Sequence, residues 1–397
     1  MSSLRVAVVA DGVPFLRRSG AQLRTLGMLQ VLRRTAAEVY LVSLVNPVLP
    51  LGEVGPEASA LDGFRMVKSG GPAKYLLASL NSVTLGKLLV RRLLPTARER
   101  DELVRAVGAF SPDVVILGST DMAPLAGLLA HSGRKIVVDC HNLDSQLSWD
   151  LFKEPGGPAS KLRRFSWYVG ALRVEKEMRG AVDQTWVPTQ ADREGLERSG
   201  LNQVRVVPSA VDVSGYAPAP GGARTIGFTG SLWYPPNQEA VRALLGEVFP
   251  KVSERVPGAR LVIAGSRPPS WMRKSARGRV SVLPDVPDMR PVLRSVSVVA
   301  VPLLRGGGMK LKVLEAMAAG KPVVTTRKGA EGIEAADGEE LLVRDVDGFP
   351  EAIAGLLESD AERGRIGARA RRLVERRYSI GAMEGTMRTV LQELGGP

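Results

Sequence analysis

The stretch VPLLRGGGMKLKVLEAMAAGKPVVTT, residues 301–326, carries most of what this sequence says about its fold. A strand is predicted to end near Leu304, three glycines follow at 306–308, and a helix then runs to about Ala319, where Gly320 ends it. Glycines let backbone N–H groups approach a ligand closely, and the first turn of a helix adds unpaired donors at a positive dipole end. A strand, a glycine loop and a helix N-terminus in this order predict a diphosphate site.

Charged residues follow directly after the glycines. Lys310 and Lys312 would place two cations near the same turn, and Glu315 could accept two hydrogen bonds from a ribose diol. The alternative is a glycine turn followed by a solvated face of Lys and Glu side chains. Spacing alone leaves both interpretations open.

Short apolar strands alternate with helical segments over the rest of the chain. The opening run LRVAVVA, residues 4–10, is β-branched and apolar, as expected of a central parallel strand. A segment with leucines at every third position follows over 21–34, and strand character returns over 39–45. The same alternation resumes after residue 224. This pattern predicts an α/β protein with two doubly wound, mostly parallel sheets.

A segment rich in Pro, Gly, Ala and Ser divides the chain at residues 208–224. Such a composition buries little surface and bends easily, so we expect a linker there. We expect one Rossmann-like domain over 1–207 and a second over 225–379. A last helix over 380–397 is expected to cross back to the first domain. The length of 397 residues agrees with two cores, because one ordinary core takes about 100 to 200 residues.

The composition is that of a globular protein with a basic surface. Hydrophobic residues make up 44% and charged residues 24%, which excludes a largely disordered or fibrous chain. Cys140 is the only cysteine, so an internal disulfide and a cysteine-rich zinc site are excluded and a reducing compartment is expected. No apolar run reaches the roughly 20 residues of a bilayer-spanning helix, which predicts a cytoplasmic protein. The net charge of +13 favours phosphates, nucleic acid or anionic lipid as partners.

Residues 301–326 resemble the donor-nucleotide segment of GT-B glycosyltransferases, in particular the retaining family 4 (glycosyl transferases group 1), which carries a similar K-x-L-E-A-M-A-x-G-x-P-V-V run. The likeness extends to IGFTGSLWYPPNQEAV at 226–241 and to VVPSAVD at 206–212. It implies a GT-B fold, in which two Rossmann-like doubly wound domains face each other across a cleft. The N-terminal domain would bind the acceptor and the C-terminal domain the nucleotide-sugar donor.

The resemblance also implies roles for single residues of the donor site. Glu315 would bind the nucleotide ribose, and Lys312 or Lys310 would bind the diphosphate. Further donor contacts are implied for Gly20, Gly230, Ser231, Val286, Gly306, Gly307, Gly308 and Met309.

His141 follows the strand predicted over 135–140 and is the implied catalytic residue, in contact with the donor sugar or its phosphate. The alternative is a histidine that caps a strand end through hydrogen bonds to the backbone. Asp139 and Asp144 flank it, and either could cap a helix or orient the ring.

Two departures from the family pattern concern the donor. Many members carry a second glutamate eight residues before the ribose-binding one, and Gly307 stands at that position here. Many members also place an Arg and a Lys after the first strand of the second domain, where this chain has LWYPPN at 232–237. We therefore expect the phosphate charge to be met by Lys310, Lys312, Arg305 or Arg267.

We expect the chemistry to need no metal ion. The run RDVDG at 344–348 has the Asp-x-Asp spacing with which a different glycosyltransferase fold holds a divalent metal. It stands between a predicted strand and a predicted helix, so Asp347 is expected to cap that helix. We also expect no resident cofactor, with a nucleoside-diphosphate sugar as the co-substrate.

The implied activity is the transfer of a hexosyl group from a nucleoside-diphosphate sugar to a glycan, a glycolipid or a small-molecule alcohol, with retention of configuration. A sugar-nucleotide epimerase shares the two-lobed plan, but it needs acid and base groups for which His141 is the main candidate. A basic nucleic-acid binder would suit the charge, yet no nucleic-acid module is recognised and aromatic residues make up only 5%. No nucleic-acid partner is expected.

Two basic stretches, 68–100 and 153–179, carry apolar and aromatic neighbours. Such segments suit helices that lie on anionic lipid. The alternative is a solvated face with some core contacts. The first interpretation predicts a peripheral contact with the cytoplasmic, inner face of an anionic membrane.

Overall fold

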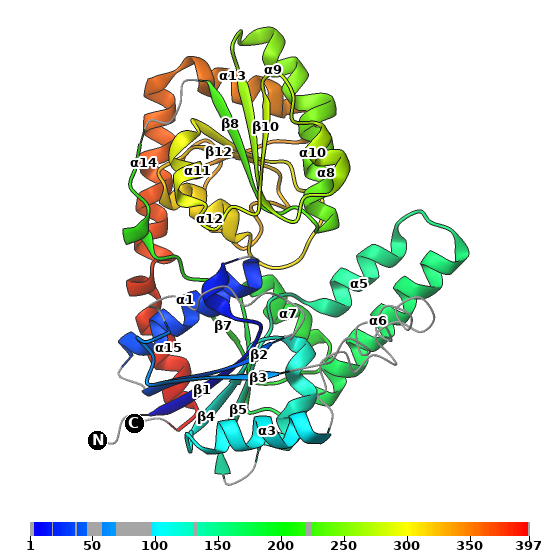
Figure 1. Ribbon diagram of the computed structural model, residues 1–397, viewed down its shortest axis with the longest axis vertical. Helices are drawn as coiled ribbons and strands as arrows, with labels where there is room; N and C mark the ends of the chain where they lie inside the picture. Colours follow the sequence, from blue (N-terminus) through cyan, green and yellow to red (C-terminus); the bar gives the residue numbers. More distant parts are fainter. Residues whose placement is uncertain are drawn as a thin grey trace. The chain divides into compact units, whose positions relative to one another are not determined.

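The computed structural model describes residues 4–17, 19–35, 38–45, 58–68, 97–130, 133–219 and 224–395. The chain folds as two compact units, coloured along the sequence in Figure 1. The first unit comprises Met1–Leu16, Met28–Pro208 and Glu384–Pro397, and the second comprises Arg17–Gly27 and Ser209–Met383. The last helix therefore contributes to the first unit from Glu384 onward.

The first unit is built on a seven-stranded sheet in which every pairing is parallel, in the order β3-β2-β1-β4-β5-β6-β7. The side chains of Val6, Val8 and Val9 in the central strand are fully buried, as expected when helices cover both faces of a parallel sheet. The strands are β1 (Arg5–Asp11), β2 (Glu38–Val45), β3 (Gly63–Lys68), β4 (Val114–Leu117), β5 (Lys135–Asp139), β6 (Gln184–Val187) and β7 (Val204–Val206).

Helices flank this sheet and connect its strands. The sidechain of Thr189 caps α7 by accepting a hydrogen bond from the N–H of Asp192, which satisfies one of the unpaired donors of the first turn. The helices are η1 (Pro14–Leu16), α1 (Gly20–Arg34), α3 (Ala97–Gly108), η3 (Thr120–Leu125), α4 (Ala126–Leu129), α5 (Asp144–Lys153), α6 (Pro158–Met178), α7 (Gln190–Arg198) and α15 (Ile380–Glu393).

The second unit contains a six-stranded sheet, again with parallel pairings throughout, in the order β10-β9-β8-β11-β12-β13. In both sheets the order reverses beside the first strand, which is the doubly wound arrangement. The α/β prediction with two such sheets is confirmed. The strands are β8 (Thr225–Ser231), β9 (Arg260–Ser266), β10 (Val280–Pro284), β11 (Val298–Val301), β12 (Val323–Thr325) and β13 (Leu342–Val343).

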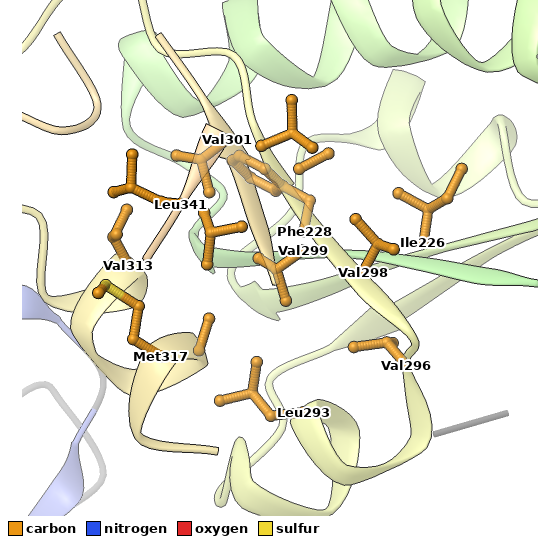
Figure 2. Close-up of a cluster of buried hydrophobic side chains, with 14 of the residues drawn as sticks. Ile226, Phe228, Leu293, Val296, Val298, Val299, Val301, Val313, Met317 and Leu341 are labelled. Atoms are coloured by element: carbon orange, nitrogen blue, oxygen red, sulfur yellow. The ribbon is translucent and has the colours of Figure 1, made fainter. Parts of the chain in front are cut away.

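The core of the second unit fixes the helix that follows the glycine loop. Val313 and Met317 of α12 are fully buried, and Figure 2 shows them in one cluster with Phe228 of β8 and Val301 of β11. The helices are η5 (Val213–Gly215), α8 (Pro235–Ala243), the π-helical turn η6 (Leu244–Val248), α9 (Phe249–Arg255), α10 (Ser270–Lys274), α11 (Arg290–Ser295), α12 (Leu311–Ala318), η7 (Val346–Gly348), α13 (Phe349–Glu358) and α14 (Asp360–Arg377).

The prediction that Asp347 caps the helix after it is wrong. Asp347 lies inside the short turn η7, and Gly348 occupies the cap position of α13 without a side-chain hydrogen bond. A 3-10 turn inserted directly before the helix moves the cap one residue along the chain. None of the helices in the described ranges is both long enough and apolar enough to traverse a bilayer.

Candidate functional site

The glycine loop joins the end of β11 to the first residue of α12. Gly306 and Gly308 have φ angles of 115° and 64°, values that side chains with a Cβ rarely adopt. Within the ranges that the structure describes, the backbone N–H groups of Gly306, Gly307 and Gly308 donate no hydrogen bond. Unpaired donors in such a loop, followed by a helix N-terminus, form the arrangement that binds anions.

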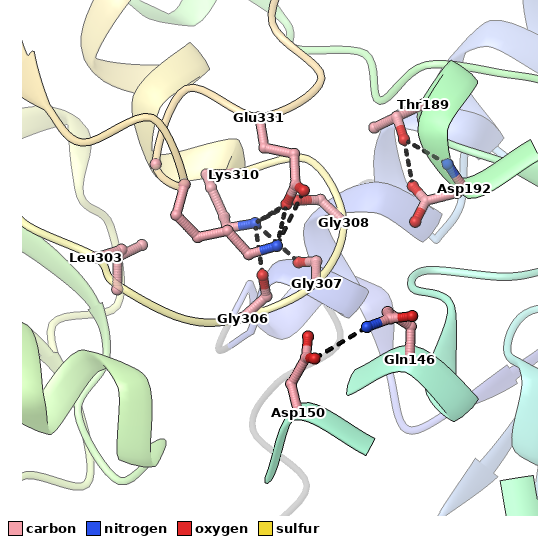
Figure 3. A network of polar contacts seen from close by, with 12 residues as sticks. Gln146, Asp150, Thr189, Asp192, Leu303, Gly306, Gly307, Gly308, Lys310 and Glu331 are labelled. Atoms are coloured by element: carbon pink, nitrogen blue, oxygen red, sulfur yellow. Dashed lines mark hydrogen bonds and ion pairs between the residues drawn. The ribbon is translucent and has the colours of Figure 1, made fainter. Parts of the chain in front are cut away.

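Lys310 is bound to the carbonyl side of the same loop. Its Nζ donates to the carbonyl oxygens of Gly306 at 3.3 Å and Gly307 at 3.0 Å, and also to that of Gly308. Glu331 Oε2 lies 3.5 Å from the same ammonium (Figure 3). Lys310 is buried, with 8% of the residue exposed, and these bonds stabilise the conformation of the loop. Its predicted contact with a diphosphate stays a prediction.

Lys312 joins three elements at the end of β8. Its Nζ donates to Asn237 Oδ1 at 2.6 Å and lies 4.3 Å from the ring centroid of Phe228. Asn237 of α8 in turn donates from Nδ2 to the carbonyl of Ser231 at 2.8 Å. A Cβ placed on Gly230 would lie 2.5 Å from Lys312 Nζ. The structure therefore brings Gly230, Ser231 and Lys312 together, as the sequence predicted, and adds Asn237.

The environment of Lys312 favours its neutral form. Burial of the ammonium lowers the pKa of Lys312 from 10.5 to about 7, the charge of Lys310 adds to this effect, and the charge of Glu315 opposes it. A lysine with a lowered pKa takes up a proton when an anion binds beside it. A diphosphate placed at the loop would raise the pKa of Lys312 again.

Glu315 stands one turn further along α12. Tyr216 Oη donates to Glu315 Oε1 at 2.7 Å, and the glutamate is 8% exposed. Burial raises the pKa of Glu315, while the Tyr216 hydrogen bond and the charges of Arg17 and Lys312 oppose the rise. Burial and the nearby Glu315 carboxylate raise the pKa of Tyr216 in turn.

A charged rim adjoins the Tyr216–Glu315 pair. Arg290 Nε donates to both carboxylate oxygens of Asp288, at 2.9 Å each. Burial alone would raise the pKa of Asp288, but the hydrogen bonds from Arg290 outweigh it and hold the pKa below its usual value. Arg17 acts electrostatically on Tyr216 as well as on Asp288. We call Gly230, Asn237, Lys312, Glu315, Tyr216 and the loop 306–308 the glycine-loop cluster.

The other residues predicted for the donor lie around this cluster with partners of their own. Arg305 forms an ion pair with Glu239, with Nε 3.0 Å from Oε2. The Arg267 guanidinium carbon lies 4.6 Å from the ring centroid of Trp233, and its backbone N–H donates to Asp285 Oδ1 at 2.7 Å. Their roles toward phosphate remain predictions.

Three further predicted residues differ in their surroundings. Val286 follows β10 and is half-buried. Met309 is half-buried, and its side chain packs against the core. Gly20 begins α1 in the part of the chain that belongs to the second unit, and a Cβ there would meet nothing within 4 Å.

Two residues of the glycine-loop cluster were not predicted from the sequence as binding residues. Asn237 stands in the P-P-N run, which was noted only as a departure from the family pattern. Tyr216 lies 99 positions from Glu315 in the segment interpreted as a linker, and no local pattern marks it.

His141 occupies a separate place in the first unit, just beyond β5. Its Nε2 lies 3.4 Å from Oδ2 of the fully buried Asp139 and makes no hydrogen bond within the described residues. The side chain is 16% exposed. Asp139 therefore stands next to the ring, whereas Asp144 begins α5. The other histidine, His131, which its polar HSGRK run predicts to lie at the surface, is outside the described residues.

Comparison with known proteins agrees with this geometry. Residues 223–359, which hold the glycine loop, match the family model described as Glycosyl transferases group 1. This region is a group 1 glycosyltransferase domain. The resemblance of the 301–326 segment to that family is thereby confirmed.

Curated proteins similar to this chain include mannosyltransferases. The chain is 30% identical over 251 residues to a phosphatidyl-myo-inositol mannosyltransferase of Mycolicibacterium smegmatis, covering 60% of this chain and 63% of the relative, which is less than two thirds of its length. It is 25% identical over 398 residues to a GDP-mannose-dependent alpha-mannosyltransferase of the same organism, covering 94% and 92%.

Solved structures show the fold of the whole chain. The sucrose-phosphate synthase of Thermosynechococcus elongatus superposes with a TM-score of 0.72 at 15% identity, covering 99% of both chains. The fold is GT-B, with its two Rossmann-like units.

Proposed function

We propose that this protein transfers a sugar from a nucleoside-diphosphate sugar to an acceptor hydroxyl. The observation that carries the proposal is the glycine-loop cluster. Unpaired backbone donors of the loop, Lys312 and the carboxylate of Glu315 stand together on α12 and the segment before it, inside the region matched by the family model.

Each part of the cluster suits one part of the donor. The loop N–H groups and Lys312 would hold the diphosphate, and they stabilise it further as negative charge develops on it during departure. Glu315 would accept hydrogen bonds from the two ribose hydroxyls. Tyr216 donates a hydrogen bond to one oxygen of this buried carboxylate.

The finer features rest on the resemblance. We propose retention of configuration, with no resident metal or cofactor taking part. His141 remains the proposed catalytic residue, supported by the buried Asp139 beside its ring. We propose GDP-mannose as the first donor to test, because a relative that covers most of the chain bears that name. The acceptor is proposed to be a glycan, a small alcohol or, in view of the name of another relative, a glycolipid.

Nucleoside diphosphates provide the direct test. Thermal unfolding with GDP, UDP and ADP should show one preferred nucleotide, and a ligand at 100 times its Kd should stabilise by roughly 2.7 kcal/mol. Lys312→Met and Glu315→Ala should strongly reduce the shift, whereas Lys251→Met, at an exposed position on α9, should keep it. An unchanged shift in the first two variants would remove the cluster from the donor site.

Product analysis separates the possible reactions. Incubation with GDP-mannose and an acceptor extract should release GDP and form a new glycoside, both detectable by mass spectrometry. An isomerised sugar nucleotide without released GDP would instead identify an epimerase.

A further inference from the structure

The hairpin of α5 and α6 is a distinct part of the first unit. Figure 1 shows the two helices side by side as an antiparallel pair that extends away from the sheet of that unit. Aromatic rings join them: the centroid of Trp149 lies 4.9 Å from that of Tyr168, and the centroid of Phe152 lies 5.5 Å from that of Phe165. These rings hold the hairpin together, and Phe165 takes part while 43% of the residue stays exposed at the edge of the contact.

The outer face of α6 is apolar and exposed. Leu162 is 65% exposed, Phe165 43% and Leu172 38%, and Val169 between them is half-buried. At 3.6 residues per turn these four side chains fall within about 80° of arc. Two buried residues of the helix, Ala171 and Met178, lie on the opposite side. Three of the seven large apolar side chains exposed in the described part of the chain thus form one stripe.

Positive charge flanks this stripe. Lys161, Arg173 and Lys176 are exposed on the same side of the helix. Five basic residues stand on α6 against two acidic ones, and of the two, Glu175 is 2% exposed while Glu177 pairs with Arg173 at 3.0 Å. The net charge of α6 is therefore positive, with Lys161 and Lys176 exposed beside the stripe.

Cations also lie over aromatic rings in the hairpin. Lys153 Nζ is 5.4 Å from the ring centroid of Trp149, and the Arg163 guanidinium carbon is 5.5 Å from that of Trp167. Long basic side chains beside an apolar surface can bury their methylene stems in a lipid interface while their charges reach the headgroups. On α5 the carboxylate of Asp150 accepts a hydrogen bond from Gln146 at 2.9 Å (Figure 3).

We propose that the outer face of α6 docks this protein on an anionic lipid bilayer. The helix of 21 residues would lie in the plane of the interface, with Leu162, Phe165 and Leu172 among the acyl chains and the flanking lysines at the anionic headgroups. The apolar stripe alone would also suit a second copy of the chain. The cationic flanks favour lipid, because two copies of the same positive face would repel each other. The stripe is independent of the glycine-loop cluster.

Vesicle sedimentation with the full chain tests the docking surface. The protein should sediment with vesicles of equal parts phosphatidylglycerol and phosphatidylcholine, should stay in solution with vesicles of phosphatidylcholine alone, and should be released by high salt. Absence of binding to the anionic vesicles would overturn the proposal.

Two paired variants locate the contact on α6. Leu162→Gln combined with Leu172→Gln removes apolar surface while keeping a good helix former, and should weaken partitioning by roughly tenfold or more. Met66→Gln, at an exposed position of β3, should leave partitioning unchanged. Lys161→Glu combined with Lys176→Glu should likewise release the protein, whereas the equal charge change in Lys251→Glu combined with Lys274→Glu should have a much smaller effect.

Two readouts make these results decisive. Thermal unfolding of each variant should match the parent, and the stabilisation by GDP should persist, so that lost docking is distinct from lost folding or a failed donor site. Equal vesicle binding by the parent and the Leu162/Leu172 variant would overturn the proposal. So would a parent dimer that the same variant converts to a monomer, because the stripe would then be covered by a second copy.

Discussion

The glycine-loop cluster of the second unit and the His141 corner of the first unit are built in opposite ways. In the cluster, side chains from several elements bond one another: Lys312 with Asn237, and Tyr216 with Glu315. In the corner, one imidazole stands 3.4 Å from a buried carboxylate and leaves Nε2 without a hydrogen bond in the described part of the chain. A mutually bonded cluster suits binding, whereas Nε2 of His141 is buried beside the Asp139 carboxylate, and its catalytic role stays a prediction.

The largest expected effect comes from removing the cation of the cluster. Lys312→Met should reduce kcat by about 100- to 1000-fold, because one donor to a developing oxyanion is worth that much in comparable sites. The measurement is steady-state release of GDP from GDP-mannose. Lys251→Met serves as the matched control. A rise in KM with kcat unchanged would mean that Lys312 binds donor and transition state equally. The cluster would then contribute to donor binding and not to the chemical step.

Substitution of His141 is expected to lower turnover while donor binding stays intact. His141→Asn should reduce kcat by about 100-fold, as for a removed acid–base or positioning group, while the Kd for GDP stays at the parent value. Calorimetry and rate measurements on the same preparation check both. If the Kd weakens as much as in Lys312→Met, the two regions do not divide binding from chemistry.

The next effect concerns stability. Tyr216→Phe removes the hydrogen bond to the buried carboxylate of Glu315 and should lower the free energy of unfolding by about 1 to 3 kcal/mol. Chemical denaturation measures it, and Tyr168→Phe on α6 is a control at a less buried tyrosine. Adding Glu315→Gln to Tyr216→Phe should restore part of the loss, because the partner left behind then carries no charge.

The smallest expected effect is a pH dependence. The pKa of Lys312 is lowered to about 7, so above that pH the lysine is largely neutral and must take up a proton when a diphosphate binds. The affinity for GDP should therefore fall by up to tenfold per unit as the pH rises above 7, and Lys312→Met should abolish this slope. Calorimetry in buffers of different ionisation enthalpy counts the proton directly.

The same lysine affects the ligand-free protein with the opposite sign. Its folded pKa lies below the unfolded value of 10.5, so the unfolded chain binds more protons between pH 7 and 10.5. The contribution of this group to the free energy of unfolding rises with pH over that window. A flat or falling contribution, compared with Lys312→Met, would contradict the burial of the ammonium.

Local patterns predicted the fold and the contiguous part of the site. The apolar runs gave the parallel strands, and the strand, glycine loop and helix at 301–326 appear as β11, the loop and α12. This stretch could be predicted because its ligand-facing groups are backbone groups of adjacent residues. The spacing of the glycines and charged residues along the sequence was therefore enough to predict the loop.

Contacts between segments far apart in the chain could not be predicted from the sequence. The bond from Tyr216 to Glu315 spans 99 positions, and that from Lys312 to Asn237 spans 75. The bonds of the Lys310 ammonium to the carbonyls of its own loop were not predicted either. The direction in which a flexible lysine turns depends on which carbonyls the folded loop presents, and the sequence does not encode this locally. The first basic stretch, 68–100, lies largely outside the described residues.

Gly230 on β8 and Gly265 on β9 are register partners. A Cβ on Gly265 would lie 1.7 Å from the carbonyl oxygen of Gly230, and one on Gly230 would strike Lys312 Nζ. Gly265 has no room for even a methyl group, whereas at Gly230 the end of the Lys312 side chain would have to move, and the φ angles of 158° and 152° strain any other residue at both positions. In a library of all single substitutions, both should be depleted of every replacement, alanine included, while Gly258, with open space around it, should accept asparagine. The two glycines thus fix the course of the backbone at the end of the sheet beside Lys312.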